Sequence, residues 1–127
     1  MQTLGQQRAE FALERITISL ANKNKDFKKE FKSFSAGVPS MILMNGFGQA
    51  LAFMVAKNDE KHRIVFSILK KWLIQKGFVN SASNTRDFLL NIAQMDQKEY
   101  LAAQKETLAL LEWVKRYAAM EAVEAGV

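Results

Sequence analysis

The chain has 127 residues with a hydrophobic fraction of 49% and a charged fraction of 24%, which suffices for one core and is too apolar for a disordered chain. It has no cysteine, and this excludes disulfides, iron–sulfur clusters, thiolate metal sites and a cysteine nucleophile. The net charge of +5 is uneven, because residues 1–32 and 57–86 are basic, residues 33–56 are uncharged and residues 87–127 are acidic.

The chain contains a single proline, Pro39, and little strand-like alternation, so the sequence predicts an all-α fold. We expect a compact single-domain bundle of about six helices over residues 1–127. The first helix is predicted from Thr3 to Leu20. The second is predicted from Asp26 to Phe34, with four lysines on the face opposite its phenylalanines, namely Lys25, Lys28, Lys29 and Lys32.

Gly37 and Pro39 are expected to separate this helix from a third one, which is predicted from Ser40 to Lys57. The third helix is almost uncharged, and its most apolar part, residues 41–56, is too short to cross a membrane and is expected to be buried. Asp59 is the expected N-cap of a fourth helix that stops at Gly77. Its apolar stripe faces away from three basic residues, Arg63, Lys70 and Lys71.

Residues 79–87 are predicted to form a polar loop, after which Asn84 or Thr85 caps a short fifth helix that reaches Ala93. Asp96 is the expected N-cap of the last helix, from Gln97 to about Glu124. Its broad apolar arc, which indicates contacts with more than one neighbour, consists of Leu101, Leu108, Leu110, Leu111, Trp113, Val114, Tyr117 and Ala118.

The residues needed for catalysis or metal binding are scarce, so we expect no catalytic residue, no metal site and no cofactor. The single histidine, His62, has no partner at ligand spacing, and we expect it to be solvated or to face a phosphate. The Asn45 to Gly48 segment lacks the strand and the lysine of a phosphate-binding loop. Most aromatic residues are expected in the core, among them Phe27, Phe31, Phe53, Phe66 and Trp72.

Three segments of the chain resemble the small subunit of the type III-B CRISPR effector, the Cmr small-subunit family. They are QQRAEFALERI near the N-terminus, PSMILMNGFGQALAFMVAK after residue 38, and YLAAQKETLALLEWVKRYAAMEA near the C-terminus. The resemblance implies a compact helical, non-catalytic protein in antiviral defence. It implies several copies beside guide RNA and target RNA, with the other Cmr subunits as partners, and neither a membrane nor a small-molecule substrate.

Within these matching segments, the resemblance suggests Lys57, Lys115 and Arg116 as nucleic-acid contacts, although they can equally be helix-end charges or interface residues. The lysines at 25, 28, 29 and 32 and the basic residues of the fourth helix are candidates from the charge pattern alone. Two alternatives remain open. The basic faces can be solvated surface or can dock on an acidic protein partner, and an enzyme built from carboxylates and lysines is a weaker third possibility. The N-terminus lacks a secretory pattern, so we expect a cytoplasmic protein.

Overall fold

The computed structural model describes residues 1–81 and 84–123, and the helices within them form an all-α fold that confirms the prediction. They are α1 (Leu4–Leu20), α2 (Lys25–Asn45), α3 (Phe47–Lys57), α4 (Glu60–Gln75), α5 (Thr85–Ala93) and α6 (Gln97–Ala122). The predicted end of the last helix at Glu124 lies outside the described residues, as do Ala82 and Ser83 of the predicted polar loop.

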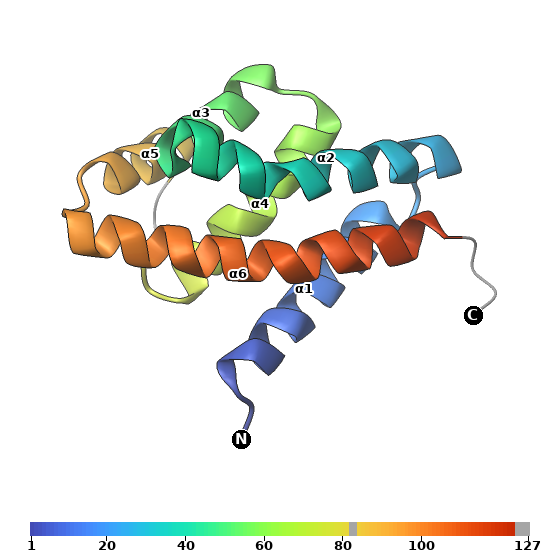
Figure 1. The fold of residues 1–127 in the computed structure, drawn as a ribbon, viewed down its shortest axis with the longest axis horizontal. Helices are drawn as coiled ribbons and strands as arrows, with labels where there is room; N and C mark the ends of the chain where they lie inside the picture. Colours follow the sequence, from blue (N-terminus) through green and yellow to red (C-terminus); the bar gives the residue numbers. More distant parts are fainter. Residues whose placement is uncertain (82–83, 124–127) are drawn as a thin grey trace.

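Helices α2 and α6 lie side by side and run in opposite directions, as Figure 1 shows. Lys28 near the start of α2 pairs with Glu121 near the end of α6 at 3.4 Å. Helix α1 crosses α6 at a steep angle and also packs against α4, while α3 packs against α2, α4 and α5. The buried side chains form one hydrophobic cluster, with Trp72 and Phe31 among its largest members.

Five helices begin at a short polar side chain that accepts a hydrogen bond from the backbone N–H three residues later. This arrangement satisfies one of the free amide groups in the first helical turn. The predicted caps Asp59 and Asp96 are confirmed, and Asn84 rather than Thr85 caps α5. Thr3 and Asn24 do the same for α1 and α2.

The predicted break at Gly37 and Pro39 is wrong, because α2 continues through both residues to Asn45. Proline has no N–H, so its place inside the helix removes one backbone hydrogen bond. The continuous helix buries Val38 and Ile42 in the same core as Phe31. This tertiary packing outweighs the local preference of proline for a helix start.

The chain turns instead at Gly46, which ends α2 and begins α3. Its φ of 96° lies in the region that only glycine adopts without strain. The Gly46 N–H donates to the carbonyl of Ile42 at 2.8 Å, and the Gly46 carbonyl accepts from the N–H of Ala50 at 3.0 Å. The predicted single helix from Ser40 to Lys57 is therefore divided between two helices.

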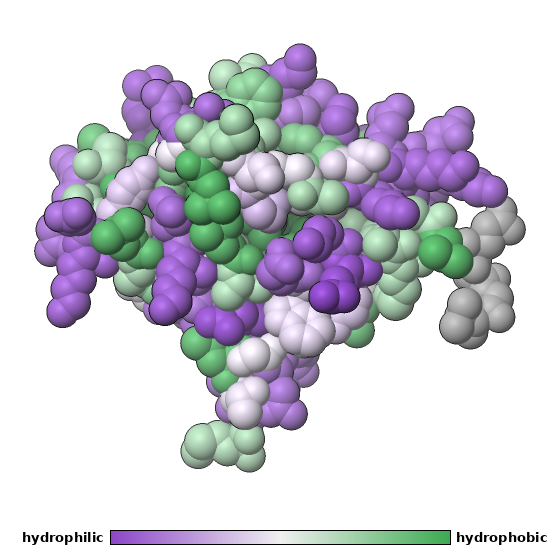
Figure 2. Space-filling view, viewed as in Figure 1, coloured by the Kyte–Doolittle hydropathy of each residue, from purple (hydrophilic) through white to green (hydrophobic). Residues whose placement is uncertain are grey.

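This division exposes part of the uncharged stretch, so the expectation that residues 41–56 are buried is only partly correct. Phe47, Leu51 and Met54 are in the core, but Leu43 is 66% exposed, Met44 83% and Phe53 46%. Figure 2 shows hydrophobic residues at the surface over the second half of α2 and over α3. The prediction that Phe53 belongs to the core is wrong.

Candidate nucleic-acid interface

The first turns of α2 carry the densest group of cations in the sequence. Lys25, Lys28, Lys29 and Lys32 fall within an arc of about 100° on the helix, since successive residues are about 100° apart. Lys29 and Lys32 are exposed and form no ion pair within the described residues, whereas Lys28 is held by Glu121. In Figure 2, hydrophilic residues gather over this end of α2.

The turn between α3 and α4 carries a second pair of cations. Lys57 is the last residue of α3 and is exposed. Arg63 lies in the first turns of α4 and donates from Nη1 to the backbone carbonyl of Asn58 at 2.5 Å. Asn58 adopts a left-handed conformation with φ of 53°, which ends α3 and lets its carbonyl face Arg63. The turn thus fixes the Arg63 guanidinium.

Two further cations lie on α4, seven and eight residues after Arg63 and therefore about 10 Å further along the helix. The Nζ of Lys70 lies 6.0 Å from the centroid of the Phe88 ring, so this side chain is partly covered by α5. Lys71 is exposed and forms no ion pair in the described part of the chain. The prediction that both point away from the apolar stripe agrees better with Lys71 than with Lys70.

The C-terminal segment suggested Lys115 and Arg116 as contacts. Both lie on α6, but they differ in whether they form an ion pair. Lys115 pairs with Glu112 on the same helix at 3.3 Å. Arg116 is exposed and has no ion pair with any described residue. Arg116 precedes Glu121 by five residues and so lies toward the end of α6 that contacts the start of α2.

Contacts between helices bring most of these cations to one end of the molecule. The ion pair between Lys23 and Glu60 and the ring contact between Phe34 and His62 place the start of α4 beside the first half of α2. The ion pair between α2 and α6 adds the end of α6. Lys70 and Lys71 lie further along α4, so the structure does not bring every predicted residue into one group.

His62 is buried, with an exposed fraction of 4%, so the expectation of a solvated or phosphate-facing imidazole is wrong. Its ring centroid lies 4.0 Å from that of Phe34 and 5.6 Å from that of Phe53, and its Nδ1 contacts the Asp59 carboxylate. Desolvation acts to raise the pKa of Asp59, but hydrogen bonds from His62 and Lys61 prevail and hold it below its ordinary value. His62 therefore joins three helices instead of meeting a ligand.

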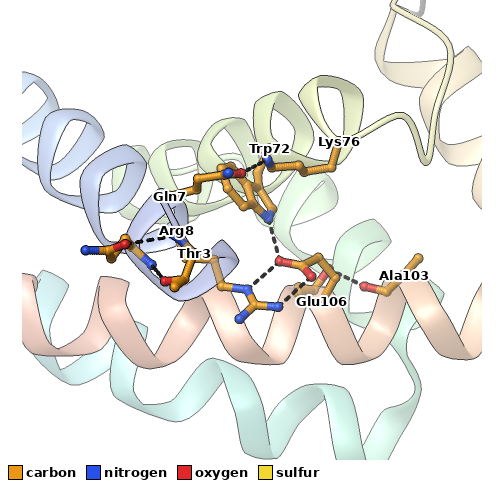
Figure 3. A network of polar contacts seen from close by, with 9 residues as sticks. Thr3, Gln7, Arg8, Trp72, Lys76, Ala103 and Glu106 are labelled. Carbon is orange, nitrogen blue, oxygen red and sulfur yellow. Dashed lines mark hydrogen bonds and ion pairs between the residues drawn. The ribbon is translucent and has the colours of Figure 1, made fainter. Parts of the chain in front are cut away.

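Sequence reasoning missed a buried ionic network centred on Glu106 of α6, which Figure 3 shows. Arg8 of α1 donates to this carboxylate twice, from Nε at 2.6 Å and from Nη2 at 2.8 Å, and Trp72 of α4 donates from Nε1 at 2.9 Å. Desolvation acts to raise the pKa of Glu106, but the hydrogen bonds from Arg8 and Trp72 lower it below the ordinary value. The Lys76 Nζ lies 4.8 Å from the Trp72 ring centroid.

The network has no sequence signal, because Arg8 and Glu106 are 98 positions apart. Its structural role is clear, since one carboxylate joins α1, α4 and α6. Among residues 1–81 and 84–123, no three His, Cys, Asp or Glu side chains are placed to hold a metal ion. In the same part of the chain no helix is both long and apolar enough to cross a membrane.

Comparison with known proteins identifies the family. Residues 4–121 match the model of the family described as CRISPR-associated protein (Cas_Cmr5). The chain belongs to this family. A relative of this Cas_Cmr5 member, the CRISPR system Cmr subunit Cmr5 of Thermus thermophilus, is 26% identical over 118 residues, which cover 93% of this chain and 95% of the relative.

A solved structure has the same fold. It is the crystal structure of a CRISPR-associated Cmr5 family protein, also from Thermus thermophilus, and it matches with a TM-score of 0.76 at 24% identity. The match covers 94% of this chain and 97% of that one. The resemblance to the Cmr small-subunit family is therefore confirmed for this Cas_Cmr5 family member.

Proposed function

We propose that the chain is a non-catalytic small subunit of a type III-B CRISPR effector complex, the Cmr complex, in the cytoplasm. In this role it helps to hold guide RNA and target RNA through its basic helix faces, as part of antiviral defence, with other Cmr subunits and further copies of itself as partners. Membership of the Cas_Cmr5 family supports the proposal, and the Thermus relative is itself named a Cmr subunit.

The observation that carries RNA contact is a set of exposed cations without ion pairs among the described residues: Lys29, Lys32, Lys57, Lys71 and Arg116. Each is attached to a helix whose other face is packed in the core, so its position is fixed by the fold. Cations that meet phosphates release condensed counterions, and this gives binding that follows backbone shape and not base sequence. Such contacts suit a subunit that serves many guide sequences.

The salt dependence of RNA binding by the assembled complex tests this role. Replacing both Lys70 and Lys71 with alanine should reduce the slope of log affinity against log salt by roughly one to two, because each lost phosphate contact contributes about 0.9 and Lys70 is partly covered by α5. The matched control replaces Lys98 and Lys105 on α6, which are exposed in the acidic part of the chain. An unchanged slope in the Lys70 and Lys71 variant would remove these two residues from the interface.

A purely protein-binding module is the second candidate function. It is favoured by the exposed Leu43, Met44 and Phe53, since large apolar side chains at a surface are typical of protein contacts. Charge reversal at Lys29 and Lys32 distinguishes the protein-binding module from the RNA-contacting subunit. Loss of co-purification with the other subunits, with RNA affinity of the remaining complex intact, would favour the module.

A further inference from the structure

Two aromatic side chains on α6, Trp113 and Tyr117, form a ring pair that the core does not enclose. Their ring centroids lie 5.9 Å apart, and the angle between the ring planes is 26°. In every other ring pair of the described residues at least one ring is buried, whereas both rings of this pair are only partly buried. The pair therefore packs against the core and still reaches the surface.

The polar atoms of this ring pair are not used within the described part of the protein. The chain has two tryptophans and two tyrosines. Trp72 donates its indole N–H to a carboxylate of α6, and the Tyr100 hydroxyl accepts from a backbone N–H of α3. The indole N–H of Trp113 and the hydroxyl of Tyr117 bond no described residue, and no buried side-chain polar atom of the described chain lacks a partner. Both atoms are therefore open to solvent.

The charges around the ring pair suit a phosphate. Arg116 shares with the two rings an arc of about 100° on the helix, is exposed and has no ion pair with a described residue. The carboxylates of residues 101–123 are each held by a cation, in the pairs Glu106 with Arg8, Glu112 with Lys115, and Glu121 with Lys28. This end of α6 lies beside the start of α2, which carries the exposed Lys29 and Lys32 (Figure 1). A polyanion would meet free cations here and no unpaired carboxylate of α6.

We propose that Trp113 and Tyr117 stack against an unpaired base of the bound RNA, while Arg116 binds a phosphate next to that base. Every nucleobase has a flat π-face, so stacking tolerates any base and suits a subunit that serves many guide sequences. A base inside a duplex has both faces covered by its neighbours, so the base that stacks here must be single-stranded or turned out of the duplex. This inference rests on the proposed function, because it requires RNA at the basic end of the molecule.

Salt dependence separates stacking from a phosphate contact at this site. Trp113→Leu keeps an apolar side chain against the core and removes the flat ring. In the assembled complex it should weaken RNA binding by roughly fivefold or more, as expected for loss of one base stacked on an aromatic ring. The loss should be equal at low and at high salt, because stacking releases no counterions. Arg116→Gln should instead reduce the salt slope by about 0.7 to 0.9.

The matched control is Phe78→Leu, because Phe78 is also a partly buried ring that packs against the core and has no ring partner among the described residues. Circular dichroism melting checks that each variant is folded, and native mass spectrometry checks that it joins the complex. If Trp113→Leu does not fold, Tyr117→Leu takes its place with the same expected loss of affinity.

A change in the RNA identifies the stacked base. An abasic nucleotide is placed in turn at successive positions of the guide RNA and the target RNA. At the stacked position it should weaken binding to the wild type but not to Trp113→Leu, because that variant has already lost the contact.

Three results would overturn the stacking contact. RNA affinity of Trp113→Leu equal to that of Phe78→Leu would do so, and the salt slope of the Lys70 and Lys71 variant would still test the proposed function separately. Failure of folded Trp113→Leu to join the complex would assign the rings to a protein partner, since tryptophan and tyrosine are also frequent in protein contacts. A loss of affinity in Trp113→Leu that adds in full to the loss at every abasic position would show that no base stacks on the rings.

Discussion

Two carboxylates contact buried side chains in this molecule, and they differ in how far along the chain their partners lie. Asp59 contacts His62, three residues later, and caps the helix on which that histidine lies. Glu106 contacts Arg8 and Trp72, which are 98 and 34 positions away. In both cases hydrogen bonds lower the pKa of the carboxyl group against an opposing effect of desolvation.

Asp59 acts within its own helix, whereas Glu106 acts between helices. Asp59 satisfies an amide of its own helix, and that role follows from its place before an amphipathic segment. Glu106 has no local role, and its burial is stabilised only because α1 and α4 bring an arginine and an indole to it. Loss of an Asp59 contact should therefore loosen one turn, whereas loss of a Glu106 contact should loosen the packing of three helices.

The largest effect is expected from Arg8→Ala, which leaves the Glu106 carboxylate with Trp72 as its hydrogen-bond donor. Removing one partner of a largely buried ion pair should lower the free energy of unfolding by roughly 2 to 3 kcal/mol. Urea denaturation at pH 7 measures the loss. Arg15→Ala on the same helix is the matched control, because Arg15 has no ion pair with a described residue. Equal losses in the two variants would show that Glu106 does not depend on Arg8.

Adding Glu106→Leu to Arg8→Ala sharpens this test. The double variant has no buried charge left to satisfy, so it should be more stable than Arg8→Ala alone. If the double variant is less stable, the loss in the single variant comes from packing and not from the unpaired carboxylate.

A smaller effect is expected at the N-caps of α4 and α6. Asp96→Ala removes an N-cap that contacts only backbone and should cost about 1 kcal/mol of stability. Asp59→Ala removes the corresponding cap of α4 and also leaves the buried His62 ring without its acceptor, so its cost should exceed that of Asp96→Ala. Thermal unfolding of the two variants side by side measures the difference. A cost for Asp59→Ala no greater than that for Asp96→Ala would show that the contact with His62 adds no stability.

Much of the fold was predictable because it depends on local rules. Capping side chains and apolar periodicity located the start of α1, α4, α5 and α6. The division of residues 25–57 was not predicted, because Pro39 is a strong local signal for a helix boundary and its cost is outweighed only by the burial of Val38 and Ile42. Gly46 is recognisable from the sequence as a small residue for packing, but its positive φ depends on the path of the whole chain.

The candidate interface was predictable only as a list of cations. Helical periodicity indicates the face of α2 on which Lys29 and Lys32 lie, and the structure agrees that they are exposed. Helical periodicity does not indicate which helix ends lie together. The start of α2, the start of α4 and the end of α6 are brought together by contacts between helices, such as the ion pair of Lys28 with Glu121. His62 was misplaced for the same reason, because the aromatic rings that bury it come from two other helices.

The smallest effect, and the most specific one, is the dependence of stability on pH. A carboxyl group whose pKa is lowered by folding contributes stability above its unfolded pKa, and that contribution is lost as the pH falls through the folded pKa. Glu106 has an ordinary value of 4.5, so the advantage of the wild type over Glu106→Gln should be full at pH 7 and should shrink as the pH falls below about 5.

For Asp59→Asn the same loss should begin at lower pH, because the ordinary value of aspartate is 3.8, and asparagine keeps the helix cap. Urea unfolding of the wild type and both variants at pH 7, 5, 4 and 3 measures the two curves. An advantage over Glu106→Gln that stays constant across this range would mean that the carboxyl group titrates alike in the folded and unfolded chain. Arg8 and Trp72 would then stabilise the protonated and the ionised carboxyl group of Glu106 to the same extent.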